Sequence, residues 1–268
     1  MFRGKCTIRL RKPINLKKLC KNCLNLPEWD PGPLHRAILS DCFACVSRLS
    51  QDKALLNQPN RYGLTPLQLA RYLHKSKMAQ MLSGVEAERG TWTLPHPIYE
   101  SWEAMEEILT WSAKEPISQD RIWKGVYYDS EIDRSLHPRI SIRKIDEEIG
   151  LGVFAEEPIP ANQFVGEYTG LIRKKKRAHD GESVYSFSLN AWRMGKVPYV
   201  ISSETMGNFT RFINHSDEPN AEAISVLWRG MPRVIFLSLK MIPKGGQILF
   251  DYGKIFWEEV PHLRKRPL

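Results

Sequence analysis

The pattern of apolar residues changes near residue 137, and this change constrains the fold more than any other feature. From there on, short alternating runs recur, among them RISIRKI (139–145), VYSFSLN (184–190) and RVIFLSLKMI (233–242), with Gly, Pro and charged residues between them. Alternation with a period of two places successive side chains on opposite faces of a β-strand. We therefore expect a β-rich domain over residues 137–258 and a different architecture before it.

The N-terminal half contains a repeat with a period of 33 residues, because PLHRAI begins at Pro33 and PLQLAR begins at Pro66. A proline directly after Thr65 suits the first turn of a helix, where its missing N–H is not needed. The pattern resembles the ankyrin repeat, and over residues 31–84 this resemblance implies two repeats of two helices each. Two repeats rarely form a stable stack alone, so we expect the basic N-terminal segment, residues 1–30, or a following helix to cap them.

Four cysteines, at positions 20, 23, 42 and 45, have the spacing C-x2-C-x18-C-x2-C. Two such pairs are typical of a structural zinc site. In the competing interpretation, Cys42 and Cys45 lie on the second helix of the first repeat, where Cys45 aligns with Met78 and is a small buried residue. The 33-residue period accounts for more of the sequence than the zinc site does, so we expect no metal.

Residues 85–136 combine a linker with a helix. RGTWTLPHPIYE (89–100) contains two prolines, and the following residues place Trp102, Met105 and Leu109 at helical spacing. After the β-rich domain, residues 259–268 form a basic tail. The expected fold class is α+β and multidomain, with a helical N-terminal half and a β-rich C-terminal half.

The charge of the chain is basic and unevenly distributed. The formal net charge is +9, and residues 1–24 hold eight Lys or Arg and no acid. This balance favours an acidic or nucleosomal partner, although it also serves solubility alone. The apolar runs are too short for a membrane span, and the start has no apolar signal-peptide segment.

The five cysteines are an odd number, which argues against a disulfide framework and favours a reducing compartment inside the cell. We expect the nucleus or, for a bacterial protein that acts on a host, the bacterial cytoplasm and then the host cell. We expect no membrane partner.

Four segments occur in one order in the second half: GLGVFA (150–155), GEYTG (166–170), GNFTRFINHSDEPN (207–220) and LFDYG (249–253). Alone, GLGVFA fits the turn of a dinucleotide-binding fold, but two prolines and no helical periodicity follow it, which favours a turn between strands. Together the four segments resemble the SET-domain protein lysine methyltransferases. The resemblance implies S-adenosylmethionine as the cofactor, a lysine of a protein such as a histone tail as the substrate, and a pseudoknot that threads the Asn214 and Tyr252 segments together.

The resemblance also assigns roles to single residues. Tyr252 is the candidate catalytic residue, and Tyr168 lies opposite it. The expected cofactor-binding residues are Gly150, Leu151, Gly152, Arg211, Phe212, Asn214, His215 and Trp257. The expected residues of the substrate channel are Tyr185, Phe250 and Phe256. A structural role is the alternative for Tyr168, His215, Arg211 and Phe212.

The expected reaction is an in-line displacement, which requires alignment of the reactants and exclusion of water rather than a nucleophilic side chain or a metal. A phenol in a narrow pocket can orient the amine, although an unperturbed pKa near 10 makes Tyr252 a poor base. In the family, the residue two positions before this tyrosine tunes the number of methyl groups transferred. Phe250 at that position predicts a di- or trimethylated product.

The sequence departs from the family at its zinc-binding segments. Asp217 stands where many members have a cysteine, and no cysteine follows Cys45, so the family's zinc after the SET domain cannot form. The cysteine-rich region before the SET domain is missing too. We expect the segment KIFWEEVPHL to close the site instead, through Phe256 or Trp257.

Two functions compete as interpretations of this pattern, and a third, nucleic-acid binding through the basic tails, is compatible with either. The first is a lysine methyltransferase whose ankyrin half recruits or positions the substrate protein. The second is an interaction module that no longer transfers methyl groups. The joint presence of Gly150, Gly152, Asn214, His215 and Tyr252 favours the enzyme.

Overall fold

The computed structural model describes residues 20, 32–60, 62–83, 94–114, 117–175, 184–189 and 199–259. The chain divides into two compact units. The helical unit comprises Met1–Arg71 and Lys75–Ala87, and the β unit comprises Tyr72–His74 and Glu88–Leu268.

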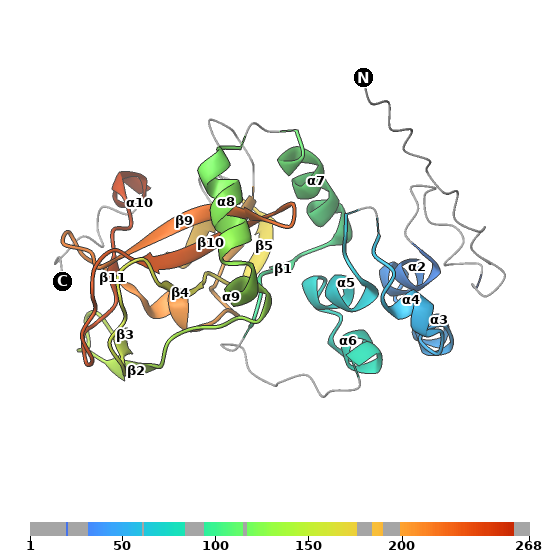
Figure 1. The fold of residues 1–268 in the computed structure, drawn as a ribbon, viewed down its shortest axis with the longest axis horizontal. Helices are drawn as coiled ribbons and strands as arrows, with labels where there is room; N and C mark the ends of the chain where they lie inside the picture. Colours follow the sequence, from blue (N-terminus) through green and yellow to red (C-terminus); the bar gives the residue numbers. More distant parts are fainter. Residues whose placement is uncertain are drawn as a thin grey trace, which may run out of the picture. The chain divides into compact units, whose positions relative to one another are not determined.

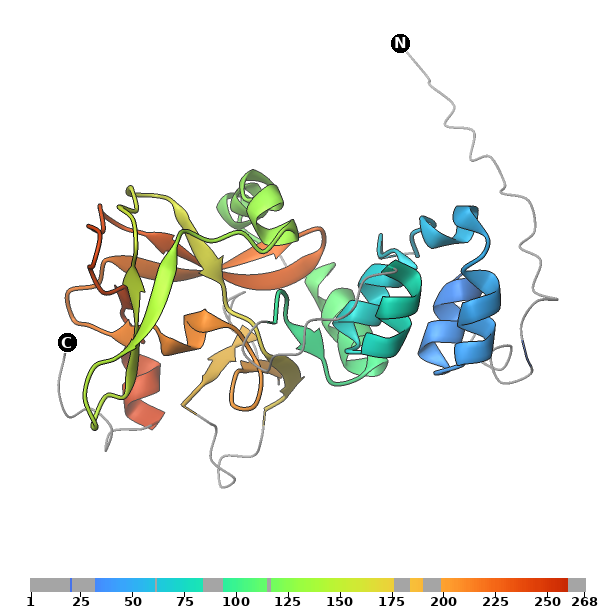
Figure 2. The same ribbon diagram turned by 90° about the horizontal axis from the view of Figure 1, so that it is seen from below.

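The helical unit contains two helix pairs that recur at a fixed interval. Its described helices are α2 (Pro33–Leu39), α3 (Phe43–Leu49), α4 (Lys53–Leu56), α5 (Pro66–Tyr72) and α6 (Ser76–Ser83). From α2 to α5 and from α3 to α6, the first residue shifts by the same 33 positions that separate the sequence repeats. Figures 1 and 2 show the two pairs side by side. The predicted period is therefore also a period of the helices, while the assignment of the pairs as ankyrin repeats stays a prediction.

The turn before α5 is fixed by side chains of both helix pairs. Asn60 Oδ1 accepts a hydrogen bond from the Leu64 N–H at 3.0 Å, and His35 Nε2 of α2 lies 2.9 Å from the Leu64 carbonyl oxygen. Thr65 and Gln68 then form a capping box. The Thr65 N–H donates to Gln68 Oε1 at 2.9 Å, and the Gln68 N–H donates to Thr65 Oγ1 at 3.3 Å.

The described strands of the β unit form three sheets. The first has the order β1-β5-β7-β6, the second β4-β10-β9-β11-β8, and the third is the hairpin β2-β3. Their bounds are β1 (Ile98–Tyr99), β2 (Ile140–Lys144), β3 (Leu151–Ala155), β4 (Phe164–Glu167), β5 (Leu171–Lys174), β6 (Ser186–Ser188), β7 (Tyr199–Ser202), β8 (Asn214–His215), β9 (Ala221–Trp228), β10 (Met231–Ser238) and β11 (Leu249–Phe250). Every residue of β10 is buried, so the second sheet holds much of the core.

Strand β9 is the longest β element that the alternating runs did not predict. It pairs with β10 along its whole length. The two strands meet at Arg229 and Gly230, whose φ angles of 48° and 80° suit the tight turn that matches the twist of a hairpin. Arg229 also binds α9 (Asp129–Asp133), because its Nε and Nη2 atoms donate to the two carboxylate oxygens of Asp129 at 2.8 Å.

Two helices cover parts of the β unit. α7 (Trp102–Ser112) is the predicted amphipathic helix, with Met105 and Leu109 buried. α8 (Gln119–Tyr127) was not predicted, and it packs against β9 (Figure 1). A Cβ atom on Gly125 would collide with the Leu227 carbonyl group, so the glycine lets the helix approach the strand closely. Among the described residues, no helix is both long and apolar enough to cross a membrane.

The Gly-x-Gly segment lies between two strands, as predicted. Gly150 has a φ angle of 83° and directly precedes β3, which pairs antiparallel with β2. Strand β4 follows β3, and the described residues 151–167 contain no helix. The segment is therefore not the strand-to-helix turn of a dinucleotide-binding fold.

Candidate active site

A cavity of about 270 Å³ lies where three distant segments of the β unit meet. Residues 184–188, 210–213 and 250–256 contribute to its lining together with Tyr168. Its aromatic residues are Tyr168, Tyr185, Phe187, Phe250, Tyr252 and Phe256. All of them except Phe187 were predicted as catalytic or channel residues, so the structure brings the predicted channel together in one place.

The hydroxyl groups of Tyr252 and Tyr168 donate to main-chain carbonyl groups beside the cavity. Tyr252 Oη lies 3.1 Å from the oxygen of Ile213, and Tyr168 Oη lies 2.7 Å from that of Tyr185. Burial raises the pKa of Tyr252, and the neighbouring phenols of Tyr168 and Tyr185 raise it further. Burial also raises the pKa of Tyr168 to about 12. Both phenols therefore stay protonated at neutral pH and serve as hydrogen-bond donors rather than as bases.

Phe250 forms an apolar wall of the cavity. Its ring lies perpendicular to that of Phe236 with centroids 5.0 Å apart, and 4.8 Å from the ring of Tyr252. The side chain is only 7% exposed. Residue 250 thus contributes bulk to the cavity but no polar group.

Helix α10 (Lys254–Glu259) places two aromatic rings beside Tyr252. Phe256 lies edge-on to Tyr252 at 4.7 Å and lines the cavity. Trp257 stacks on Tyr252 at 5.9 Å and lies edge-on to His215 at 4.7 Å. The two residues predicted to close the site therefore both pack against Tyr252, but only Phe256 lines the cavity, while Trp257 lies against the ring of His215.

Backbone pairing brings the Asn-His segment to the tyrosine segment. Strands β8 and β11 run parallel, with His215 opposite Phe250. Asn214 Nδ2 donates to the carbonyl oxygen of Leu151 at 2.9 Å, which ties residues 150–152 to the same place. The predicted cofactor residues of both segments are therefore neighbours, although 63 residues separate Leu151 from Asn214.

His215 has a hydrogen-bond partner at each ring nitrogen. The backbone N–H of Tyr252 donates to Nδ1 at 3.2 Å, and Nε2 lies 3.2 Å from Asp217 Oδ1. Because Nδ1 accepts a hydrogen bond, a neutral ring carries its proton on Nε2 and donates it to Asp217. Asp217, which stands where the family resemblance led us to expect a cysteine, therefore orients the imidazole.

Arg211 and Phe212 were predicted on the cofactor side, and the structure places Arg211 at the cavity instead. Its guanidinium group lies over the ring of Tyr185, 3.9 Å from the centroid, and it lines the cavity. Phe212 lies next to it, with its ring centroid 5.1 Å from the Arg211 guanidinium carbon. Contact of either residue with the cofactor stays a prediction.

Asn208 supports the cavity and was not predicted. It caps the 3-10 helix η4 (Phe209–Phe212), because its Oδ1 accepts the Thr210 N–H at 3.1 Å. Its Nδ2 donates to the Glu167 carbonyl oxygen at 2.9 Å. Asn208 thus joins the GNFTRF segment to GEYTG. Its position at the start of a short helix, where asparagine is favoured, was a signal in the sequence.

A buried ion pair behind the cavity was also not predicted. Arg233 of β10 and Glu167 of β4 are 0% and 1% exposed, and Arg233 Nη1 lies 3.4 Å from Glu167 Oε1. His96 Nδ1 lies 3.2 Å from the other carboxylate oxygen of Glu167. Charged residues inside apolar strands were the available signal, but their pairing depends on the β4–β10 register.

Comparison with known proteins places this site in a recognised domain. Residues 150–253 match the family model described as "SET domain". The chain is 35% identical to the histone-lysine N-methyltransferase EHMT1 of Mus musculus over 132 residues. This alignment covers 47% of this chain and 10% of that protein. The chain is 35% identical over 111 residues to the histone-lysine N-methyltransferase SETD2 of Homo sapiens, covering 40% of this chain and 4% of that protein.

A shorter relative is the probable histone-lysine N-methyltransferase set-23 of Caenorhabditis elegans, 35% identical over 112 residues that cover 39% of this chain and 46% of that protein. The chain thus spans less than half the length of each of these relatives. All residues that line the cavity except Phe256 lie within the matched region. The β unit therefore contains a SET domain over residues 150–253, and the relatives that share it are histone-lysine N-methyltransferases.

Proposed function

We propose that the β unit transfers methyl groups from S-adenosylmethionine to the side-chain amine of a lysine in a protein substrate. The observation that carries this proposal is the aromatic cavity, which gathers Tyr168, Tyr185, Phe250, Tyr252 and Phe256 inside or beside the SET region. A narrow, largely apolar cavity suits the extended chain of a lysine, with polar atoms only where the amine must be held.

The residues beside the cavity fit the cofactor that SET-domain lysine methyltransferases use. A Cβ atom added to Gly150 would meet no atom within 4 Å, so this backbone is open to a ligand. Asn214 and His215 lie beside it, and the half-buried Trp257 offers a flat apolar surface to an adenine ring. When bound, the cofactor supplies an electrophilic methyl group on a positively charged sulfur.

The side chains of the cavity prepare the amine for the reaction. An apolar aromatic wall disfavours the charged ammonium form, so the lysine loses its proton to solvent before or during entry. Tyr252 and Tyr168 remain protonated, and with the carbonyl oxygens of Ile213 and Tyr185 they provide fixed dipoles that orient the neutral amine. Phe256 covers the cavity and limits the access of water.

The test is methyl transfer by the full chain with labelled S-adenosylmethionine and a nuclear extract or purified histones. We expect label on protein, and a loss of about 100-fold or more in Tyr252→Phe, which keeps the aromatic packing and removes only the hydroxyl group. Tyr127→Phe, at an exposed tyrosine of α8, is the matched control and should keep full activity.

Three outcomes separate the alternatives. Label that Tyr252→Phe reduces strongly supports the enzyme. Label that Tyr252→Phe leaves unchanged rejects the role of this tyrosine. No label with any substrate, although the chain binds the cofactor in calorimetry, supports an interaction module instead.

We also propose that the product is di- or trimethyl-lysine. Phe250 adds no hydroxyl group that would hold a water or the amine, so space remains for an amine that already carries methyl groups. Mass spectrometry of the product should show di- or trimethylation for the wild type and a shift toward monomethylation for Phe250→Tyr. Monomethylation by the wild type, with no change in the variant, would contradict this proposal.

A histone is the first substrate to test, because the relatives named above are histone-lysine N-methyltransferases. We propose that the two helix pairs are ankyrin repeats and that they recruit the substrate protein or an acidic or nucleosomal partner. The 33-residue period of the helices and the basic charge support this role. Removal of residues 1–71, which keeps Tyr72–His74 of the β unit, should then raise the KM for the protein substrate while the affinity for S-adenosylmethionine stays unchanged.

A further inference from the structure

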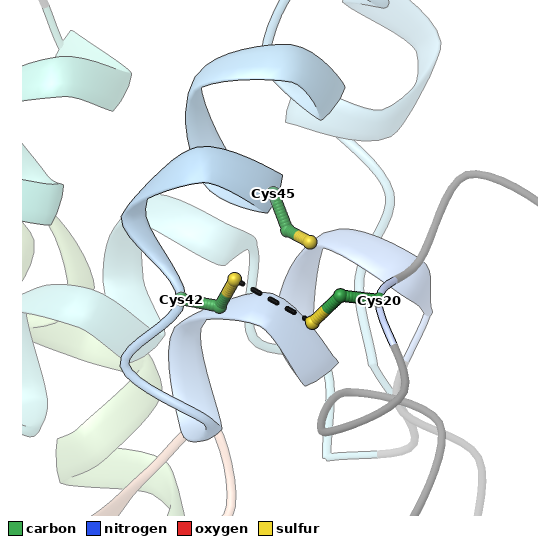
Figure 3. Close-up of side chains that lie close together, drawn as sticks. All are labelled: Cys20, Cys42 and Cys45. Atoms are coloured by element: carbon green, nitrogen blue, oxygen red, sulfur yellow. Dashed lines mark hydrogen bonds between the residues drawn. The ribbon is translucent and has the colours of Figure 1, made fainter.

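Three cysteine sulfur atoms meet at the start of α3, in the helical unit. Cys42 directly precedes the helix, Cys45 lies in its first turn, and Cys20 comes from the segment before α2. The three Sγ atoms lie within 4.8 Å of one another, and those of Cys20 and Cys42 are 3.7 Å apart. Figure 3 shows the three side chains pointing toward a common centre.

These distances suit sulfur ligands arranged around one metal ion. Zinc binds thiolate sulfur at about 2.3 Å, and tetrahedral geometry then separates neighbouring sulfurs by about 3.8 Å. The Cys20–Cys42 distance of 3.7 Å is close to this value. A disulfide would join only two of the sulfurs at about 2 Å and would leave the third without a role. None of the three cysteines forms a disulfide in the structure.

A positive charge lies beside the cluster. The Arg48 Nη2 atom lies 3.7 Å from Cys45 Sγ. A zinc ion with three or four thiolates carries a net negative charge. The sequence on either side of Cys20 is basic, with eight Lys or Arg and no acid in residues 1–24.

We propose that Cys20, Cys42 and Cys45 bind a structural zinc ion. The sequence favoured a buried apolar role for Cys45, and this residue is indeed 2% exposed on the second helix of its pair. Its sulfur nevertheless faces the other two, so burial and metal binding are compatible at this position. Cys23 lies outside the described residues; its spacing from Cys20 repeats that of Cys42 and Cys45.

The zinc ion fastens the segment around Cys20 to the first helix pair. A stack of two repeats is short for independent stability, and the ends of such stacks require a cap. Metal bonds that form only in the folded chain add their binding free energy to folding. The site is separate from the zinc clusters that flank other SET domains, because all of its ligands precede the β unit.

The test is metal analysis of the full chain, purified under reducing conditions without added chelator. We expect roughly one zinc per chain, and near-zero zinc in Cys20→Ser and Cys42→Ser. Cys6→Ser, at the one cysteine outside the spaced pairs, is the matched control and should keep its zinc. Cys23→Ser should lower the zinc content if this residue is the fourth ligand.

Cobalt substitution of the wild-type chain keeps the proposal testable even if a variant fails to fold. Co²⁺ held by thiolates in a tetrahedral site gives characteristic visible and near-ultraviolet bands, which added zinc should abolish. Two results would overturn the proposal: a reduced wild-type chain that takes up neither zinc nor cobalt, or full zinc content in folded Cys20→Ser and Cys42→Ser.

Discussion

The helical unit and the β unit differ in how far along the chain their fixing contacts reach. In the helical unit, Thr65 bonds to Gln68 three residues away, and His35 reaches Leu64 within a single repeat period. In the β unit, Asn208 bonds to a carbonyl group 41 residues away and Asn214 to one 63 residues away. A single substitution should therefore disturb the β unit more than the helical unit, because it disconnects segments that no local structure holds together.

The largest expected effect is at the buried ion pair of the β unit. Arg233→Met removes the positive charge beside the buried Glu167 carboxylate and leaves it only the contact with His96, so we expect the free energy of unfolding to fall by about 3–5 kcal/mol. The matched control is Arg229→Met on the same hairpin, where the arginine is 42% exposed and loses its surface ion pairs and its contact with the Trp228 ring. Its cost should stay below about 1 kcal/mol. Urea unfolding of both variants measures the difference, and equal costs would break the comparison.

The next effect concerns alkaline pH. Burial raises the pKa of Tyr168 to about 12, above its ordinary value of about 10. Between about pH 10 and pH 12 the folded chain therefore keeps the Tyr168 proton, whereas the unfolded chain loses it. The contribution of the protonated Tyr168 to the free energy of unfolding is complete below pH 10 and is lost as the pH rises through about 12. Between these two pH values the free energy of unfolding of the wild type should fall by roughly 2–3 kcal/mol more than that of Tyr168→Phe. Parallel slopes of unfolding free energy against pH would contradict this expectation.

A smaller effect is expected in the helical unit. Thr65→Ala removes the hydroxyl group that caps α5, and a lost cap costs about 1 kcal/mol. Thr65→Ser keeps the hydroxyl group and should recover most of the stability. Thermal unfolding followed by circular dichroism measures both variants. A loss as large as that of Arg233→Met would show that local contacts in the repeats matter as much as distant ones in the β unit.

The smallest effect should come from the exposed residue that orients His215. Asp217→Ala removes the acceptor of the Nε2 proton, and we expect the affinity for S-adenosylmethionine to fall about threefold. Asp217→Asn keeps an acceptor oxygen and should retain nearly full affinity. Calorimetry measures both. If the two variants weaken binding equally, the carboxylate charge rather than the hydrogen bond is what matters.

Features that depend on neighbouring residues could be predicted from the sequence. The repeat period, helix α7 and the turn at Gly150 follow from spacing, amphipathicity and the conformational freedom of glycine. Strand β9 was missed because its first half mixes small and charged residues, and its place is set by pairing with β10. Helix α8 was not predicted, because it packs against β9 through Gly125, whose missing side chain lets the helix backbone approach the strand closely.

The sequence by itself identified part of the candidate site, because the motif segments contain Tyr168, Asn214, His215 and Tyr252. Only the tertiary structure decided their neighbours. The contact of Asn214 with Leu151, the pair of Glu167 with Arg233, and the meeting of Cys20 with Cys42 depend on segments that pack together after long loops close. Such contacts leave no periodic signal, because the distance along the chain between two partners is fixed by the fold rather than by the geometry of a helix or strand.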